Sequence, residues 1–187
     1  MKYTGEYLDA LAVKRVASLM AASIRTAPKS CGADTLETLV LDGEDKESLV
    51  STMFLLAEET GMDFYRRDAE NIRTSECILL VGAIASYMAT PFCGFCGMEN
   101  CGNAMEHSTT CAFSGINLGI ALGSAVSIAS ANHIDNRIMF SAGKAAQKLG
   151  LFERKMTIVL GVPLSVTGKS PFYDRNTVSI TKPIFVN

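Results

Sequence analysis

The sequence predicts an α+β fold in which a small sheet is flanked by helices. Three apolar runs have the length of strands: Leu36–Leu41 (LETLVL), Cys77–Ile84 (CILLVGAI) and residues 156–164 (MTIVLGVPL). Longer segments between them repeat their apolar residues at helical spacing. No repeat or linker divides the chain, so we expect a single domain over residues 1–187. Strands so short and few do not make a doubly wound sheet, which leaves an α+β arrangement.

Helical periodicity and stop signals place the helices. Residues 7–26 (YLDALAVKRVASLMAASIRT) form one helix, which Pro28 and Gly32 end. Further helices are predicted over residues 45–59, 62–71, 112–131 and 135–150. In the last of these we expect Asp135 as N-cap, Arg137 exposed in the first turn and Gly150 as the stop. In the tail, residues 177–180 (TVSI) and 183–186 (PIFV) are candidates for edge or exchanged strands.

Composition excludes several classes of protein. Hydrophobic residues make up 48% of the 187 and charged residues 19%, which is enough apolar material for a real core. The net charge is −2 and Lys and Arg form no cluster, so no nucleic-acid partner is expected. Glu6 and Asp9 stand where a signal peptide needs apolar residues, and we therefore expect a cytoplasmic protein.

Residues 112–131 (AFSGINLGIALGSAVSIASA) carry no charge and have the length of a membrane span. Four serines, three glycines and Asn117 make the segment semi-polar, so we expect a buried central helix and no membrane partner. Gly119 and Gly123 form a G-x3-G pair, which allows close packing of backbones in membranes and in soluble cores alike.

Four of the six cysteines lie within nineteen residues: Cys93, Cys96, Cys101 and Cys111, at the spacing C-x2-C-x4-C-x9-C. Cytosolic thiols are kept reduced, so this cluster indicates a metal site rather than disulfides. Zinc usually takes its ligands from two C-x2-C turns, and only one is present, although His107 is an alternative ligand. A [4Fe–4S] cluster needs four thiolates, and its fourth ligand can come from the start of a following helix. We therefore expect an iron–sulfur segment inserted at residues 92–113, with zinc and [2Fe–2S] as alternatives.

Glycines follow three of these cysteines, at Gly94, Gly97 and Gly102, where the backbone can wrap closely and turn its N–H groups inward. The aromatic residues Phe92, Phe95 and Phe113 are expected either to shield the cluster or to be ordinary core residues. Of the two other cysteines, Cys77 opens an apolar strand and is expected in the core. Cys31 lies in a loop, and no local feature marks it as reactive.

Several stretches together resemble a family of uncharacterised prokaryotic proteins that contain a ferredoxin domain. They are AASIRTAPKSCGAD, CGFCGMENC, NLGIALGSAVSIASANHIDNRIMFSAGKAAQKLG and GVPLSVTGKSPFYDR, which between them span nearly the whole chain. The family's activity is not established, so the resemblance implies an iron–sulfur protein without naming a reaction.

A fainter similarity is to nitroreductase-like flavoproteins, carried by AASIRTAPKS and by IVLGVPL with the basic residues after it. It implies a homodimer with FMN at the interface and exchanged C-terminal segments. Nitroreductases hold the FMN phosphate with arginines ahead of the first long helix, where this chain has MKYTGEYLDA. The resemblance leaves Lys169 and Arg175, with help from Lys29, as the phosphate-binding candidates. The alternative is that they are solvated or pair with Asp174.

Three functions follow from these observations. The first is a redox protein, in which a [4Fe–4S] cluster carries electrons to an unidentified partner or small molecule. The second is an FMN-dependent reductase of the nitroreductase type. The third is a non-enzymatic module stapled by a metal, because the sequence shows no Ser-His-Asp set, paired acidic motif, P-loop or dinucleotide fingerprint.

Overall fold

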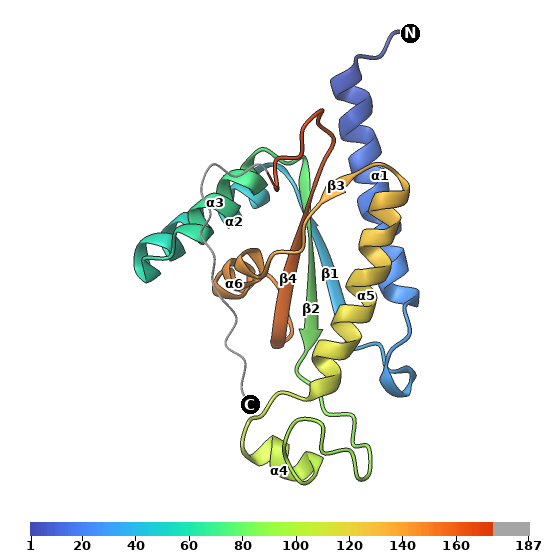
Figure 1. Ribbon diagram of the computed structural model, residues 1–187, viewed down its shortest axis with the longest axis vertical. Helices are drawn as coiled ribbons and strands as arrows, with labels where there is room; N and C mark the ends of the chain where they lie inside the picture. Colours follow the sequence, from blue (N-terminus) through green and yellow to red (C-terminus); the bar gives the residue numbers. More distant parts are fainter. Residues whose placement is uncertain (174–187) are drawn as a thin grey trace.

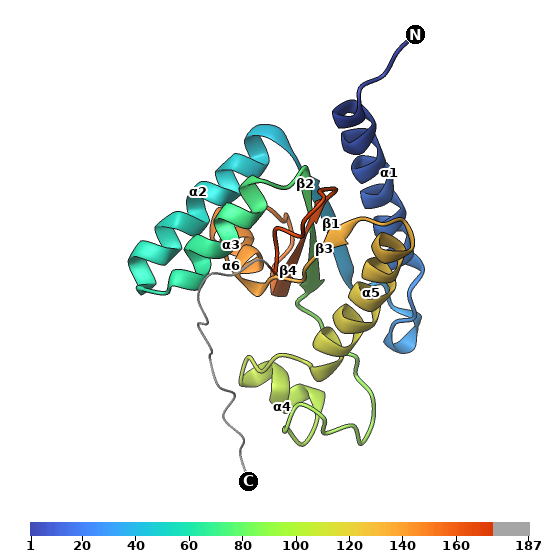
Figure 2. The same ribbon diagram turned by 45° about the horizontal axis from the view of Figure 1, so that its top comes forward.

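The computed structural model describes residues 1–173. A four-stranded antiparallel sheet with the strand order β1-β2-β4-β3 lies between two layers of helices, α1 and α5 on one face and α2, α3 and α6 on the other (Figures 1 and 2). The helices are α1 (Gly5–Thr26), α2 (Gly43–Thr60), α3 (Asp63–Arg73), α4 (Cys101–Glu106), α5 (Ala112–Ala131) and α6 (Phe140–Leu149), with a 3-10 turn at Ser30–Gly32. The strands are β1 (Leu36–Leu41), β2 (Cys77–Ile84), β3 (Asp135–Asn136) and β4 (Met156–Ser165).

The central strand β2 explains why its sequence is apolar throughout. Its alternate side chains Cys77, Leu79, Val81 and Ala83 pack under α1 and α5, while Ile78 and Leu80 pack under α2, α3 and α6. Two hydrophobic clusters therefore share one sheet, and all six of these side chains are fully buried. This confirms the predicted strand that is covered on both faces.

The helix α5 has one buried face. Its buried residues recur at helical spacing, from Ser114 through Leu118 and Leu122 to Ala129, and pack against α1 and the sheet. Ile116 and Ile120, on the other face, are 43% and 45% exposed. By length and composition alone α5 could cross a membrane, and it is the one such helix in the described part of the chain. The prediction of a fully buried central helix is thus only partly right.

The G-x3-G pair of α5 does not mediate close packing within the chain. Gly119 and Gly123 are exposed, and a Cβ atom added at either would have no neighbour within 4 Å. Close backbone packing occurs instead on α6, where a Cβ at Gly143 would lie 1.7 Å from the carbonyl oxygen of Val159 in β4. Only glycine lets α6 approach the sheet this closely.

The predicted helix over residues 135–150 is wrong in its first five residues. Asp135 and Asn136 are extended and pair with Ser165 and Leu164 of β4, forming β3. Met139 then bridges to Gly161, and the helix begins only at Phe140. Asp135 is therefore not an N-cap, because its backbone belongs to the sheet. The stop at Gly150 is confirmed, with a left-handed φ of 64°.

The chain between β2 and α5, residues 85–111, forms a loop beyond one end of the sheet and carries the short helix α4 (Figure 1). The strands β2 and β4 are antiparallel, so this loop lies at the end where β4 begins. The segment after β4, residues 166–173, lies at the opposite end. Residues 177–180 and 183–186, the predicted tail strands, lie outside the described residues.

Candidate metal centre

The four clustered cysteines meet at one pocket within the loop of residues 85–111. The pocket is narrow, with about 20 Å³ that admits the centre of a water molecule. Its lining joins the four thiols to apolar side chains: Cys93, Cys96, Cys101, Cys111, Tyr87, Met88, Phe95, Met98, Ala104, Ala112 and Phe113 among others. The structure thus brings together all four residues that the sequence predicted as metal ligands.

The first two cysteines are held by a tight turn. The amide of Gly97 donates to the carbonyl oxygen of Gly94 at 2.9 Å, closing the chain around Cys96. Gly94 and Gly97 have φ values of 62° and 81°, which favour glycine strongly over other residues. The expectation that glycine permits a close wrap is met at these two positions. Gly102 instead lies inside α4 with no positive φ.

The other two cysteines stand at helix starts. Cys101 is the first residue of α4, and the side-chain oxygen of Asn100 caps that helix by accepting from the amide of Asn103 at 3.0 Å. Cys111 occupies the N-cap position of α5, as predicted from its place before the apolar helix, and its side chain is buried.

Tyr87, which the sequence analysis missed, fixes the position of α4. Its hydroxyl donates to the carbonyl oxygen of Ala104 at 3.3 Å, and the amide of Thr109 donates to the same oxygen at 2.8 Å. Tyr87 also lines the cysteine pocket. The only sequence signal was an aromatic hydroxyl six residues ahead of the cysteine motif, and a single residue carries no periodicity.

The four thiols that line the pocket match the ligand type and number of a [4Fe–4S] cluster. Among the described residues, no group of three or more His, Cys, Asp or Glu side chains is arranged to hold one metal ion. A tetrahedral zinc ion requires its ligands to converge on one point, whereas in a [4Fe–4S] cluster each thiolate binds a different iron. His107 does not line the pocket, because its Nδ1 lies 2.9 Å from the carbonyl oxygen of Asn103 in the preceding turn.

The aromatic residues of the loop do not form a closed shield. Phe92 is fully exposed and Phe95 is 70% exposed. The ring of Phe95 packs against that of Phe113, tilted by 35° with 5.9 Å between centroids, so one edge of the pocket is aromatic. Phe92 is therefore neither shield nor core residue.

The remaining two cysteines are far from equivalent. Cys77 lies fully buried in β2, and burial raises the pKa of its thiol to about 12, which confirms the predicted core residue. Cys31 is exposed in the 3-10 turn, with a φ of 57°. This turn docks on α5, where the side-chain oxygen of Asn117 accepts from the amide and hydroxyl of Ser30 at 3.0 and 2.9 Å.

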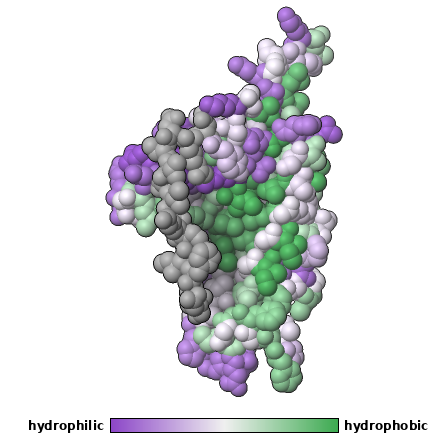
Figure 3. All heavy atoms as spheres, viewed as in Figure 1, coloured by the Kyte–Doolittle hydropathy of each residue, from purple (hydrophilic) through white to green (hydrophobic). Residues whose placement is uncertain are grey.

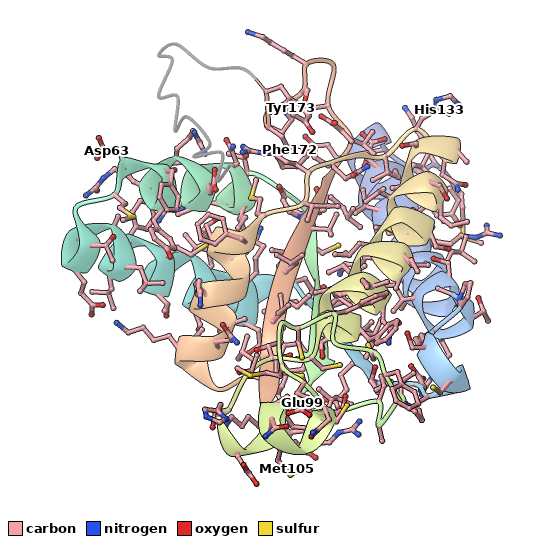
Figure 4. All side chains as sticks on the ribbon, turned by 60° about the horizontal axis from the view of Figure 1, so that its bottom comes forward. Asp63, Glu99, Met105, His133, Phe172 and Tyr173 are labelled. Atoms are coloured by element: carbon pink, nitrogen blue, oxygen red, sulfur yellow. The ribbon has the colours of Figure 1, made fainter. Side chains whose placement is uncertain are left out.

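The candidate phosphate ligands do not join the cysteines. Lys169 is exposed on the segment after β4, and a ten-residue strand that spans about 30 Å separates this segment from the cysteine loop. Figure 4 shows Phe172 and Tyr173 of that segment at the opposite end of the molecule from Glu99 and Met105 of the loop. Arg175 lies outside the described residues. Lys29 is engaged elsewhere: its Nζ donates to the carbonyl oxygens of Ile24, Arg25 and Ala27 at 2.7, 2.9 and 3.0 Å. Lys29 thus caps the end of α1, and its proposed help with a phosphate is not supported.

Arg137 was expected to be an exposed helix residue, and it lies instead in a buried ionic network. The carboxylate of Asp68 on α3 is almost fully buried; its Oδ1 lies 2.8 Å from Arg67 and 3.5 Å from Arg137. The hydroxyl of Ser141 donates to Oδ2 of Asp68 at 2.7 Å. Arg137 also donates to the carbonyl oxygen of Phe172 at 3.5 Å, which ties the segment after β4 to α3 and α6.

Comparison with known proteins supports the sequence resemblance. The profile of a family described as "uncharacterized protein containing a ferredoxin domain" matches residues 107–175. A protein of Archaeoglobus fulgidus, itself described only as uncharacterized, is 45% identical over 171 residues, covering 87% of this chain and 91% of the relative. The chain belongs to this family of ferredoxin-domain proteins. Of the four clustered cysteines, the matched stretch contains only Cys111, so the ligand set rests on the structure and the spacing.

Solved structures show that the fold is nitroreductase-like. Nitroreductase CinD from Lactococcus lactis has a TM-score of 0.58 at 12% identity, covering 90% of this chain and 84% of its own. A nitroreductase family protein from Clostridium novyi has a TM-score of 0.59 at 13% identity, with coverages of 86% and 77%. A putative NAD(P)H:FMN oxidoreductase from Staphylococcus epidermidis scores 0.55 at 10% identity, with coverages of 90% and 82%. At such identities the likeness concerns the fold alone.

Proposed function

We propose that this protein is a cytoplasmic iron–sulfur redox protein that carries one [4Fe–4S] cluster on Cys93, Cys96, Cys101 and Cys111. The observation that supports this most directly is that four thiols from one tight turn and two helix starts line one pocket. When bound, such a cluster supplies one-electron transfer. The chain's own part is to present four thiolates, to close the turn of Gly94 and Gly97 around Cys96, and to anchor α4 through Tyr87.

Metal and sulfide analysis of anaerobically purified protein tests the proposal. We expect broad brown absorbance, with about four iron and four sulfide per chain. Replacing any one of the four pocket cysteines by serine should lower the iron content, whereas Cys31→Ser, a matched change at an exposed thiol, should leave it unchanged. Colourless protein containing zinc would exclude the redox function and favour a metal-stapled structural module. A reversible midpoint potential separates the two, because zinc has no redox chemistry.

A flavin-dependent reductase is the second candidate, supported by the nitroreductase-like fold and by neighbours whose descriptions name FMN. Within the described residues the support is thin, since no arginine precedes residue 15 and Lys29 is engaged with α1. Titration with FMN, followed by flavin fluorescence, tests it. Binding that weakens at least tenfold in Lys169→Ala and Arg175→Ala, but not in the surface control Lys148→Ala, would support FMN as a second cofactor. Absence of binding would remove this candidate.

We also propose that the protein is a homodimer that associates through α1 and α5. Both helices cover the same face of the sheet and carry exposed apolar side chains. Figure 3 shows apolar side chains gathered along α5 and in the recessed area beside it. The exposed set comprises Tyr7, Leu8, Leu11, Leu19, Ile116 and Ile120. Apolar surface of this extent on adjacent helices is typical of an interface.

Light scattering after gel filtration tests the dimer. Wild-type protein should show about twice the 20.0 kDa mass of one chain. The double variant Leu11→Glu/Ile120→Glu should be monomeric, because it places charge within the apolar face. Leu55→Glu, on α2 and similarly exposed at 52%, is the control and should remain dimeric. A monomeric wild-type protein would disprove this assembly.

A further inference from the structure

The outer surface of the cysteine loop combines exposed apolar side chains with acidic side chains that form no ion pair with a described residue. Phe92, Phe95 and Met105 are 104%, 70% and 61% exposed, which is unusual for side chains of this size on one short loop. Phe95 lines the cysteine pocket, Phe92 directly precedes Cys93, and Met105 lies one turn after Cys101 on α4, so all three belong to the segment that carries the cysteines. Aromatic residues and methionine are enriched at the centres of protein interfaces.

The charge on this surface has one sign. No Lys or Arg occurs between Thr74 and Asn136 in the sequence. Glu99 and Glu106 are exposed on the loop, and neither forms an ion pair with any residue that the structure describes. Figure 4 shows both Glu99 and Met105 at this end of the molecule. The cation Lys155 is at the root of the loop, where its carbonyl oxygen accepts from the amide of Ala85 at 2.9 Å.

We infer that this surface docks a soluble redox protein whose own electron-transfer site is apolar at its centre and ringed by Lys and Arg. The inference rests on the proposed cluster, since it explains why an apolar, acidic surface covers the four cysteines. Complementary charge steers such a partner and fixes its orientation, and the apolar centre excludes water from the contact. A second copy of this chain does not fit this face, because Glu99 and Glu106 would meet like charges. An anionic membrane surface is disfavoured for the same reason.

The transfer that this docking serves is a single electron. When bound and reduced, the cluster would give up one electron, and the ferric haem of cytochrome c, the probe used below, would accept it. No proton moves and no bond is formed or broken. In the experiment dithionite is the reductant that supplies the electron.

A basic cytochrome c, whose haem edge is surrounded by lysines, is a suitable probe. Its reduction by the dithionite-reduced protein is followed anaerobically in a stopped-flow instrument at increasing ionic strength. Glu99→Gln/Glu106→Gln should lower the second-order rate constant about three- to tenfold at low salt, and the difference should vanish at high salt. Phe92→Ser should lower the rate constant at all salt concentrations. The midpoint potential should be unchanged in both variants.

Matched controls change the same chemistry elsewhere on the molecule. Glu44→Gln/Glu58→Gln removes two exposed carboxylates from α2, and Leu55→Ser removes an exposed apolar side chain from the same helix. Both should reduce cytochrome c as fast as the wild type. Acetylating the lysines of cytochrome c should abolish the salt dependence for the wild-type protein.

Binding of the two oxidised proteins provides a readout in which no electron moves. Calorimetry at low salt should give an association that weakens at least threefold in Glu99→Gln/Glu106→Gln and stays constant in the α2 controls. One result would overturn the docking surface alone. The iron content would be normal, but reduction of cytochrome c and binding to it would change neither with salt nor in either loop variant. Binding of the loop to a second copy or to anionic vesicles in preference to cytochrome c would also overturn it. Protein without a reversible redox couple would contradict the proposed function instead, whatever the binding result.

Discussion

The six cysteines of the chain have free thiols in three different environments. Four line the pocket of the loop, Cys31 is exposed in the turn after α1, and Cys77 is fully buried in the central strand. Alkylation requires an accessible thiolate. Burial, which blocks access, and a raised pKa, which lowers the fraction of thiolate, therefore both protect a thiol. The three environments should therefore react in a fixed order.

Differential alkylation with iodoacetamide at pH 8, read by mass spectrometry, checks this order. In anaerobically purified protein Cys31 should be labelled first and alone. After chelation of iron the four pocket cysteines should follow. Cys77 should react only in denaturant, because it has no exposed surface and its pKa is raised to about 12. Labelling of Cys77 in the native protein, or of the pocket cysteines before chelation, would contradict the arrangement.

Asp34 carries the clearest pH dependence among the side chains. Burial acts to raise the pKa of its carboxyl, but the hydrogen bond from Arg25 and the charge of Lys29, 3.5 Å away, together hold that pKa below its ordinary value of 3.8. A carboxyl with a lowered folded-state pKa stabilises the fold above its unfolded pKa, and this contribution is lost as the pH falls through the folded value. The loss therefore belongs to the range below about pH 4.

The variant Asp34→Asn should lose this contribution. We expect about 1 kcal/mol less stability at pH 7, since the pair is partly exposed and Lys29 keeps its three carbonyl acceptors. Urea unfolding at pH 7 and pH 3 measures it. The wild-type and variant curves should differ at pH 7 and converge at pH 3, whereas Asp9→Asn, at an exposed carboxylate without an ion pair among the described residues, should match the wild type at both.

For individual residues, the sequence predicted well what depends on neighbours along the chain, and poorly the contacts between residues far apart in the sequence. The spacing of the four cysteines and the burial of Cys77 could be read from neighbours along the chain. The ion pair of Arg137 could not, because its partner Asp68 lies far away along the chain. The acceptors of Lys29 are close in sequence, but they face its ammonium group only because α1 ends at Thr26.

Among the elements, the contact between α6 and β4 is the most sensitive to a single atom. A Cβ at Gly143 would overlap the carbonyl oxygen of Val159, so Gly143→Ala must push the helix off the sheet. We expect a loss of about 2 to 3 kcal/mol in the free energy of unfolding. Gly5→Ala is the control: it lies at the exposed start of α1 with nothing near its Cβ and should change stability by less than about 1 kcal/mol. Equal stability of the two variants would refute the contact.

Long periodic elements were predictable, and short ones were not. The strands β1 and β2 and the helix α5 begin and end where their apolar runs and turn residues predicted. The six-residue helix α4 spans fewer than two turns, too few for a helical period to be visible. The two residues of β3 are extended because β4 offers them a pairing edge, and this tertiary contact overrides the helical pattern that runs through residues 135–139.

For the molecule as a whole, the loop of residues 85–111 does not take part in the hydrophobic core that holds the sheet and its helices together. Neither hydrophobic cluster of the core contains a residue of the loop. The variant with all four pocket cysteines replaced by alanine should therefore keep the helical circular dichroism and a cooperative urea transition. The slope of its unfolding free energy against urea concentration should match that of the wild-type protein from which iron has been removed. A disordered variant would show that the metal is needed to fold the chain.

For the proposed iron–sulfur protein, this independence has a consequence for oxidative damage. If oxygen dismantled the inorganic centre, the scaffold that held it would stay assembled, with its thiols ready to be reduced and refilled. The polypeptide would mature first, and iron and sulfide would be delivered afterwards. Repair would need only that last delivery, and no new synthesis of the chain.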